Sequence, residues 1–197
     1  MTFSTEVSSW CSPKAVELSA APQIGNKAPS CPELPLPAAN GKPTIVTFLR
    51  HCGCPVAEAT FLDIRKASSQ QPDINFIAVS HSDEPSTTKW VTAVGGTSEP
   101  GSPNTVTVLV DPERKIYAQW GLGTTSWSHV LSLKALMNII KLGSEKGIWN
   151  RPTESGTRWQ SGGFWAVDAS GVVRWGRAAR RADDYIDVEE AIKAVRT

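Results

Sequence analysis

The chain has 197 residues, and its 20 Lys and Arg against 19 Asp and Glu give a formal net charge of +1 at pH 7. This balance argues against a general electrostatic attraction to nucleic acid or to an anionic membrane surface. No segment approaches the roughly 18 consecutive apolar residues that a membrane-spanning helix needs. The 4 cysteines are too few for a disulfide-dense secreted scaffold, and residues 1–10 lack the basic and apolar parts of a secretory signal. We therefore expect a single-domain cytoplasmic protein.

Prolines recur through the first part of the chain, with Ser, Ala and Asn between them. Because proline fixes φ and removes a backbone donor, this composition predicts an extended arm rather than a helix or a strand. We expect a Pro/Ser-rich N-terminal arm at residues 1–28 and a folded domain at residues 29–197. Leu34 and Leu36 are the residues expected to anchor the proline-containing chain on the domain surface.

Regular structure is expected from residue 44 onward. Residues 44–49 are apolar and largely β-branched, which predicts a strand buried on both faces. Pro55 suits the first position of a helix, and apolar residues follow it at helical spacing. Two more strands are expected at residues 74–80 and 105–110, and two more helices at residues 85–94 and through Ile116 and Trp120.

The second half of the chain predicts a helix, a hairpin and a last helix. Apolar residues between Val130 and Ile140 form an amphipathic pattern that we expect to end near Gly143. Residues 164–167 and 172–175 flank a Gly-containing turn, as in a β-hairpin. Val188, Ile192 and Val195 mark the C-terminal helix. This order of elements predicts an α/β three-layer sandwich with a mixed central sheet and helices on both faces.

The turn between the first strand and the first helix carries the candidate chemistry. Its sequence is Arg50-His51-Cys52-Gly53-Cys54-Pro55. A thiol at a helix N-terminus faces unpaired backbone N–H groups and the positive end of the helix dipole, and both favour the nucleophilic thiolate. Cys54 is nearer to the helix and is the expected nucleophile. Arg50 supplies a fixed positive charge and His51 a switchable one. The alternative is that both cysteines only fill space beneath the turn.

The stretch from Phe48 to Pro55 resembles the active-site turn of thioredoxin-fold, peroxiredoxin-like proteins of the alkyl hydroperoxide reductase/thiol-specific antioxidant superfamily, in a divergent branch with a Phe-Leu-Arg-x-x-Gly-Cys-Pro signature. Residues 24–29 and 163–173 are similar to the opening segment and the late hairpin of that family, and residues 120–127 resemble a segment of fungal members. The resemblance implies a thioredoxin-like fold and a thiol oxidoreductase in which Cys54 attacks a peroxide or a disulfide. His51 stands where peroxiredoxins place Thr or Ser.

An oxidised Cys54 needs a second thiol to complete a redox cycle. Cys52 is nearest in sequence, although a Cys-x-Cys disulfide closes a small ring that departs from relaxed geometry. Cys31 and Cys11, in the proline-containing chain before the first strand, are alternatives, as is an external reductant such as glutathione or thioredoxin. The sequence leaves this choice open. The resemblance also implies a homodimer as one form of assembly.

A competing interpretation keeps the fold and assigns the site to a small organic molecule of specialised metabolism, without a redox cycle. Trp127 and His129, together with Arg158 and Gln160 just before the late strand, are the expected substrate contacts. For the Trp residues the alternative is core packing, for His129 a surface or capping position, and for Arg158 and Gln160 a role in holding the long loop. A metal site built from His51, Cys52 and Cys54, with His81 or His129 as a further ligand, is less favoured, because structural zinc sites usually pair Cys-x2-Cys with a second close pair. We expect no metal and no other cofactor.

Overall fold

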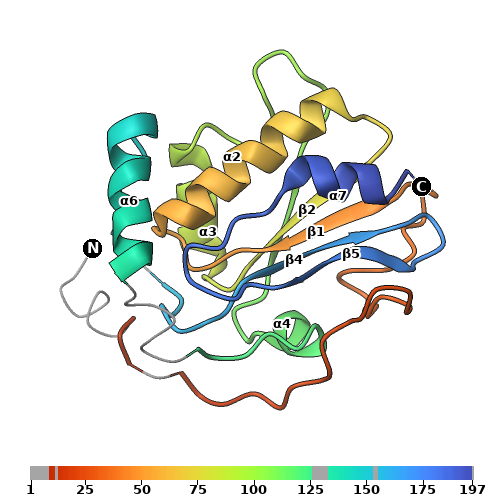
Figure 1. Ribbon diagram of the computed structural model, residues 1–197, viewed down its shortest axis with the longest axis horizontal. Helices are drawn as coiled ribbons and strands as arrows, with labels where there is room; N and C mark the ends of the chain where they lie inside the picture. Colours follow the sequence, from red (N-terminus) through yellow and green to blue (C-terminus); the bar gives the residue numbers. More distant parts are fainter. Residues whose placement is uncertain (1–8, 12, 126–132, 153–154, 197) are drawn as a thin grey trace.

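The computed structural model describes residues 9–11, 13–125, 133–152 and 155–196 (Figure 1). Its central element is a five-stranded sheet with the strand order β3-β2-β1-β4-β5. The strands are β1 (Thr44–Phe48), β2 (Asn75–Ser80), β3 (Thr107–Val110), β4 (Gly163–Val167) and β5 (Val173–Ala178). The helices are α2 (Pro55–Gln70), α3 (Glu84–Ala93), α4 (Lys115–Gln119), α6 (Leu133–Lys146) and α7 (Val188–Ala194). The predicted order of elements is confirmed within a few residues at each boundary.

The sheet is mixed, as predicted. Strand β1 pairs in parallel with β2, which pairs in parallel with β3, whereas β4 is antiparallel to both β1 and β5. Each of the five residues of β1 is buried, because the strand is central in the sheet and both of its faces are covered. The hydroxyl of Tyr117 lies 2.6 Å from the carbonyl oxygen of Leu49 and 2.7 Å from that of Val79. This contact holds the carboxyl ends of β1 and β2 together. The turn of residues 50–55, called the cysteine turn below, begins at this point.

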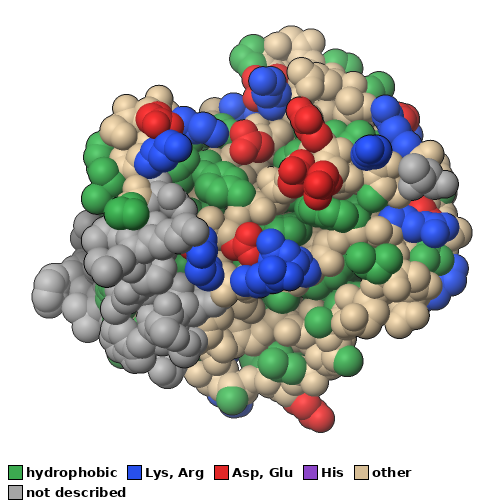
Figure 2. Space-filling view, viewed as in Figure 1, with side chains coloured by type: hydrophobic (Ala, Val, Ile, Leu, Met, Phe, Trp, Pro, Cys, Tyr) green, Lys and Arg blue, Asp and Glu red, His purple; other side chains and the backbone are tan. Residues whose placement is uncertain are grey.

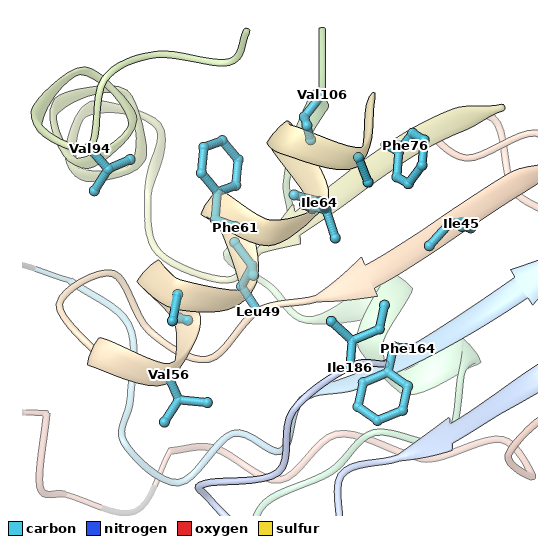
Figure 3. Packing of buried hydrophobic residues seen from close by; sticks show 14 of the residues in the cluster. Ile45, Leu49, Val56, Phe61, Ile64, Phe76, Val94, Val106, Phe164 and Ile186 are labelled. Atoms are coloured by element: carbon cyan, nitrogen blue, oxygen red, sulfur yellow. The ribbon is translucent and has the colours of Figure 1, made fainter. Parts of the chain in front are cut away.

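One face of the sheet is covered by α2, α3 and α7 (Figure 1). Phe61 and Ile64 of α2 are completely buried and pack in one apolar cluster with Ile45 and Phe164 of the sheet. Figure 3 shows Leu49 and Val56 in the same cluster, on either side of the cysteine turn. The N-terminus of α2, with the turn that precedes it, is therefore fixed by core packing on the sheet.

The other face is covered by α4 and by the chain that precedes β1 (Figure 1). Leu34 and Leu36 are buried in a second apolar cluster that contains Trp120 and Trp165, so their predicted anchoring role is confirmed. The carboxylate of Asp111 accepts three backbone N–H bonds from the first turn of α4, which satisfies donors that a helix start leaves unpaired. With helices on both faces of a mixed sheet, the predicted α/β architecture is confirmed.

Helix α6 ends later than the sequence suggested. It continues through Gly143 to Lys146, and Gly147, with a φ of +68°, follows it. The N–H groups of Gly147 and Ile148 donate back to the carbonyls of Gly143 and Leu142, as in a glycine-terminated helix end. A Cβ on Gly143 would lie 2.6 Å from the Trp149 ring. The Trp149 ring thus leaves no room for a side chain at Gly143, and the helix ends before Gly147.

Charges of both signs are interspersed on the face of the molecule shown in Figure 2. This pattern agrees with the near-zero net charge of the sequence. Among the described residues, no helix is long and apolar enough to cross a membrane.

Candidate functional site

The two neighbouring cysteines lie in a tight turn that leads directly into α2. The N–H of Cys54 donates to the carbonyl of His51 at 3.1 Å, and Gly53 inside the turn has a φ of +111°. Cys54 is the residue that caps the N-terminus of α2, and Pro55 is its first helical residue. The sequence prediction that Cys54 stands at a helix start is confirmed by this geometry.

Cys54 is buried, with 3% of its surface exposed, and its sulfur contacts the side chain of Arg50. The Nη1 atom of Arg50 lies 3.7 Å from the Cys54 sulfur. The Nη2 atom of the same guanidinium donates to the carbonyl of Arg158 at 2.6 Å. The hydrogen bond that Arg50 donates to the Arg158 carbonyl therefore orients the guanidinium that faces the Cys54 sulfur. A positive charge held in this way stabilises a thiolate more than it stabilises a thiol.

A small cavity of about 30 Å³ adjoins Arg50 at the start of α2. Thr47 and Arg50 both line it, and among the described residues the hydroxyl of Thr47 and the Nε of Arg50 are buried without a hydrogen-bond partner. Buried polar atoms normally have partners, so two unpaired ones at one cavity indicate a place for a small polar molecule. A volume above about 15 Å³ is enough for a water-sized molecule. The side chain of Arg50 thus contacts the Cys54 sulfur and also lines a space that fits a water-sized molecule.

Cys52 has different surroundings, toward β2 and α3. Its sulfur lies 3.6 Å from the hydroxyl oxygen of Ser80 and 3.9 Å from that of Thr87. Its backbone N–H donates to the hydroxyl of Ser82 at 3.2 Å. The sulfur of Cys52 is therefore surrounded by neutral hydroxyl groups, whereas that of Cys54 faces a guanidinium.

The structure corrects the expectation that His51 carries a switchable positive charge. The ring is 2% exposed, and burial, followed by the charges of Arg50 and Arg158, holds the pKa of His51 well below its ordinary value. His51 is consequently uncharged near neutral pH, because its buried ring cannot hold a proton beside two guanidinium groups. The positive charge at the cysteine turn comes from Arg50.

The second buried histidine, His81, makes stability depend on pH. Burial lowers the pKa of His81 from 6.5 to about 4. Between these two pH values the unfolded chain therefore binds more protons than the folded one. The contribution of His81 to the free energy of unfolding is fully present above pH 6.5 and is lost as the pH decreases to 4. We expect a loss of about 3 kcal/mol over this range. Urea unfolding at pH 7, 6, 5 and 4 measures it, and a His81→Gln variant should show a smaller slope. Equal slopes for the two proteins would contradict the assignment.

The substrate contacts predicted from the sequence fall in different places. Arg158 is brought to the site, since its carbonyl accepts the bond from Arg50 and its side chain binds the hydroxyl of Ser9 at 3.0 Å. Gln160 is buried, and its amide donates to the carbonyls of Leu122 and Gly123. These contacts correspond to the loop-holding alternative, and ligand contact by either residue stays a prediction. Trp127 and His129 lie outside the described residues.

The two cysteines that precede β1, Cys11 and Cys31, differ in their position relative to the turn. Cys31 packs against the cluster of Trp120 and Trp165, on the opposite face of the sheet from Cys54, and burial raises the pKa of its thiol. Cys11 is exposed and shares a cavity with His81 and Arg114. Of the two, Cys11 is therefore the one close in sequence to Ser9, whose hydroxyl accepts a hydrogen bond from Arg158 in the loop before β4.

Sequence reasoning missed several residues of this site. Thr47 was expected only as a buried strand residue, and no local signal distinguished its hydroxyl. Ser9 and Trp10 were assigned to an extended arm, yet the Arg158 guanidinium lies 4.8 Å from the centre of the Trp10 ring. Contacts across about 150 positions leave no local pattern in a single sequence. Among the described residues, no group of three or more His, Cys, Asp or Glu side chains is placed to hold a metal ion.

A family model described as AhpC/TSA antioxidant enzyme matches residues 62–181, which begin after the cysteine turn. No curated protein matches. A thiol peroxidase from Chromobacterium violaceum is 15% identical, with a TM-score of 0.55 and coverage of 94% of this chain and 98% of that one. A peroxiredoxin-like protein from Aquifex aeolicus is 12% identical, with a TM-score of 0.59 and coverage of 94% and 97%. These likenesses confirm the predicted thioredoxin-like fold.

Proposed function

Since the chain belongs to the AhpC/TSA antioxidant enzyme family, we propose that it is a peroxiredoxin-like thiol oxidoreductase that reduces a peroxide with Cys54 as the nucleophile. The family match covers the scaffold but not the two cysteines of the turn. The assignment of Cys54 therefore depends on the geometry around the sulfur.

The observation that supports the proposal is the double contact of Arg50. Its Nη1 lies 3.7 Å from the Cys54 sulfur, and Arg50 also lines the small cavity together with Thr47. The Nε of Arg50 and the hydroxyl of Thr47 are both buried without a hydrogen-bond partner. One side chain thus faces both the nucleophile and a space of about 30 Å³. A peroxide in that space would receive hydrogen bonds from donors that otherwise have no partner.

In the proposed reaction the Cys54 thiolate attacks one oxygen of the peroxide. The O–O bond breaks, an S–O bond forms, and the leaving oxygen takes a proton to become water or an alcohol. The product on the protein is a sulfenic acid. Arg50 stabilises the thiolate before the attack and the negative oxygen that leaves. His51 is uncharged and therefore has no proton to add as an imidazolium near neutral pH.

A non-redox role in binding a small organic molecule is the competing proposal. The cavity next to Cys52, which is larger than the one next to Arg50, favours it. The two functions predict different chemistry at Cys54, because only the first one consumes a peroxide.

The proposal is tested by the reaction of the protein with hydrogen peroxide. We expect peptide mapping after dimedone labelling to find sulfenic acid at Cys54 before any other cysteine. Arg50→Met should slow this oxidation at pH 7 by about 10- to 100-fold, because it removes the charge that stabilises the thiolate. The oxidation rate of Arg50→Lys, which keeps the charge, should lie between the rates of Arg50→Met and of the original protein. Oxidation that starts at Cys52 or Cys11, or an unchanged rate in Arg50→Met, would overturn the proposal.

A further inference from the structure

A cavity of about 110 Å³ lies between the chain that precedes β1 and the loop that follows α4. The chain before β1 runs past α4 (Figure 1) and is fixed there at two points. The carbonyl of Lys14 accepts a hydrogen bond from Nη2 of Arg114, and the N–H of Ser19 donates to the carbonyl of Ala118 at 3.0 Å. The segment between these points supplies an apolar wall of the cavity, with Ala15, Val16 and Leu18.

Arg114 brings a buried positive charge to this cavity. Its side chain lines the cavity, and the residue is only 9% exposed. In the described part of the chain its guanidinium forms no ion pair, and the hydrogen bond to the Lys14 carbonyl uses Nη2 alone. Buried charges in proteins are normally paired, because an unpaired one loses its hydration without compensation. An anion in the cavity would supply the missing counter-charge.

The backbone at Arg114 also indicates a role for its side chain. With φ +60° and ψ +29°, it is the one residue other than glycine with a positive φ among those that the structure describes. Glycine or asparagine adopts this left-handed conformation at lower cost. An arginine here is therefore present despite the preference of the backbone.

Gln160 brings an unsatisfied acceptor to the same cavity. It lines the cavity and is 1% exposed. Its Nε2 donates to the carbonyls of Leu122 and Gly123 at 2.9 and 3.2 Å, which fixes the orientation of the amide. Its Oε1 is buried, and no described residue donates a hydrogen bond to it. Because an unpaired buried acceptor is costly, this oxygen indicates a ligand with a donor group, independently of Arg114.

We propose that this cavity binds a short hydroxy acid, whose carboxylate pairs with Arg114 and whose hydroxyl donates to Oε1 of Gln160. Its volume corresponds to roughly three or four water molecules, which limits the ligand to a few carbon atoms. The lining contains no carboxylate, and Glu17 of the neighbouring segment is exposed and does not line it. An amino acid is disfavoured for this reason, since its ammonium group would lie near a guanidinium without a counter-charge.

The inference does not rest on the proposed function. Arg50, Cys52 and Cys54 are not among the residues that line this cavity. Binding is measured without peroxide and without any reaction at a cysteine. The result therefore stands or fails separately from the assignment of Cys54 as a nucleophile.

The test is titration calorimetry of the unmodified protein with three probes of similar size. L-Lactate carries both groups, propionate lacks the hydroxyl, and lactamide lacks the charge. We expect lactate to bind, propionate to bind about 5- to 10-fold more weakly, and lactamide about 10- to 100-fold more weakly. Absence of lactate binding, or equal affinity for lactate and lactamide, would overturn the inference. Equal affinity for lactate and propionate would overturn the contact with Gln160.

Variants assign the binding to the two side chains. Arg114→Asn removes the charge and suits the left-handed backbone, so it should fold, as its melting temperature will show, and bind lactate at least 10-fold more weakly. Arg180→Gln, which removes an exposed arginine that does not line the cavity, is the matched control and should bind lactate normally. Gln160→Met should bind lactate and propionate equally. Unchanged lactate binding by Arg114→Asn would show that the anion lies elsewhere and would overturn the inference.

Discussion

Replacing Cys54 with Ser is expected to abolish peroxide-dependent oxidation of the protein and peroxide consumption in the presence of a thiol reductant. A serine hydroxyl is not ionised near neutral pH, so the guanidinium of Arg50, 3.7 Å from the present sulfur, has no anion to stabilise. The folded structure should survive, because the side chain is similar in size and makes no capping hydrogen bond to α2. Peroxide consumption measured at equal protein concentrations gives the result directly.

The control for this variant is Cys11→Ser. It removes one thiol from the chain as Cys54→Ser does, but it removes an exposed one that makes no part of the cysteine turn. We expect its peroxide consumption to match that of the original protein. If Cys54→Ser kept the activity while Cys11→Ser lost it, the nucleophile would be on the arm, and the assignment of Cys54 would be wrong.

Replacing Gly53 with Ala is expected to destabilise the protein by about 4 kcal/mol. The φ of +111° at this position is strained for any residue with a Cβ. The added carbon would also lie 2.8 Å from the carbonyl oxygen of Arg151 and 3.0 Å from that of Pro152. Both atoms belong to a backbone segment that is bound to the turn, since the N–H of Arg151 donates to the Gly53 carbonyl at 2.9 Å. The segment must therefore shift, and the turn with it.

Gly96→Ala separates the two causes. Gly96 has a φ of +87°, but nothing lies within 4 Å of the position where its Cβ would be. This variant should lose about 1–2 kcal/mol from backbone strain alone. Urea unfolding of both variants measures the difference, and the variant at Gly53 should also react more slowly with peroxide. Equal losses of stability would show that the contact between the turn and the residue 151–152 backbone is unimportant.

The sequence was sufficient to place Cys54 at a helix start. The evidence was local: a β-branched apolar run, two cysteines and a proline suited to the first helical position, within 12 residues. Because the dipole and unpaired N–H groups of a helix belong to its first turn, the position of the helix start also fixes the electrostatic character of that position. The same local pattern could not show that His51 is uncharged, because the burial that lowers its pKa comes from packing.

The surroundings of the two thiols required the tertiary structure. Arg50 is oriented by the carbonyl of Arg158, 108 positions away, and Arg158 in turn binds Ser9, 149 positions away. The cavity beside Cys52 forms only when α3 and the segment after α6 meet at the turn. Such contacts follow from the packing of distant segments and leave no periodicity in one sequence.

From the amino-acid order alone came the α/β class, the succession of strands and helices, and the strand-to-helix turn that carries two cysteines, since these depend on hydrophobic spacing and on residues that begin helices. The folded chain alone decided that Cys54 faces the guanidinium of Arg50, which also lines a small cavity, while Cys52 faces hydroxyl groups and lines a larger cavity. The reason is that charge, burial and cavity shape at a given atom are set by all segments that pack around it, whatever their distance along the chain.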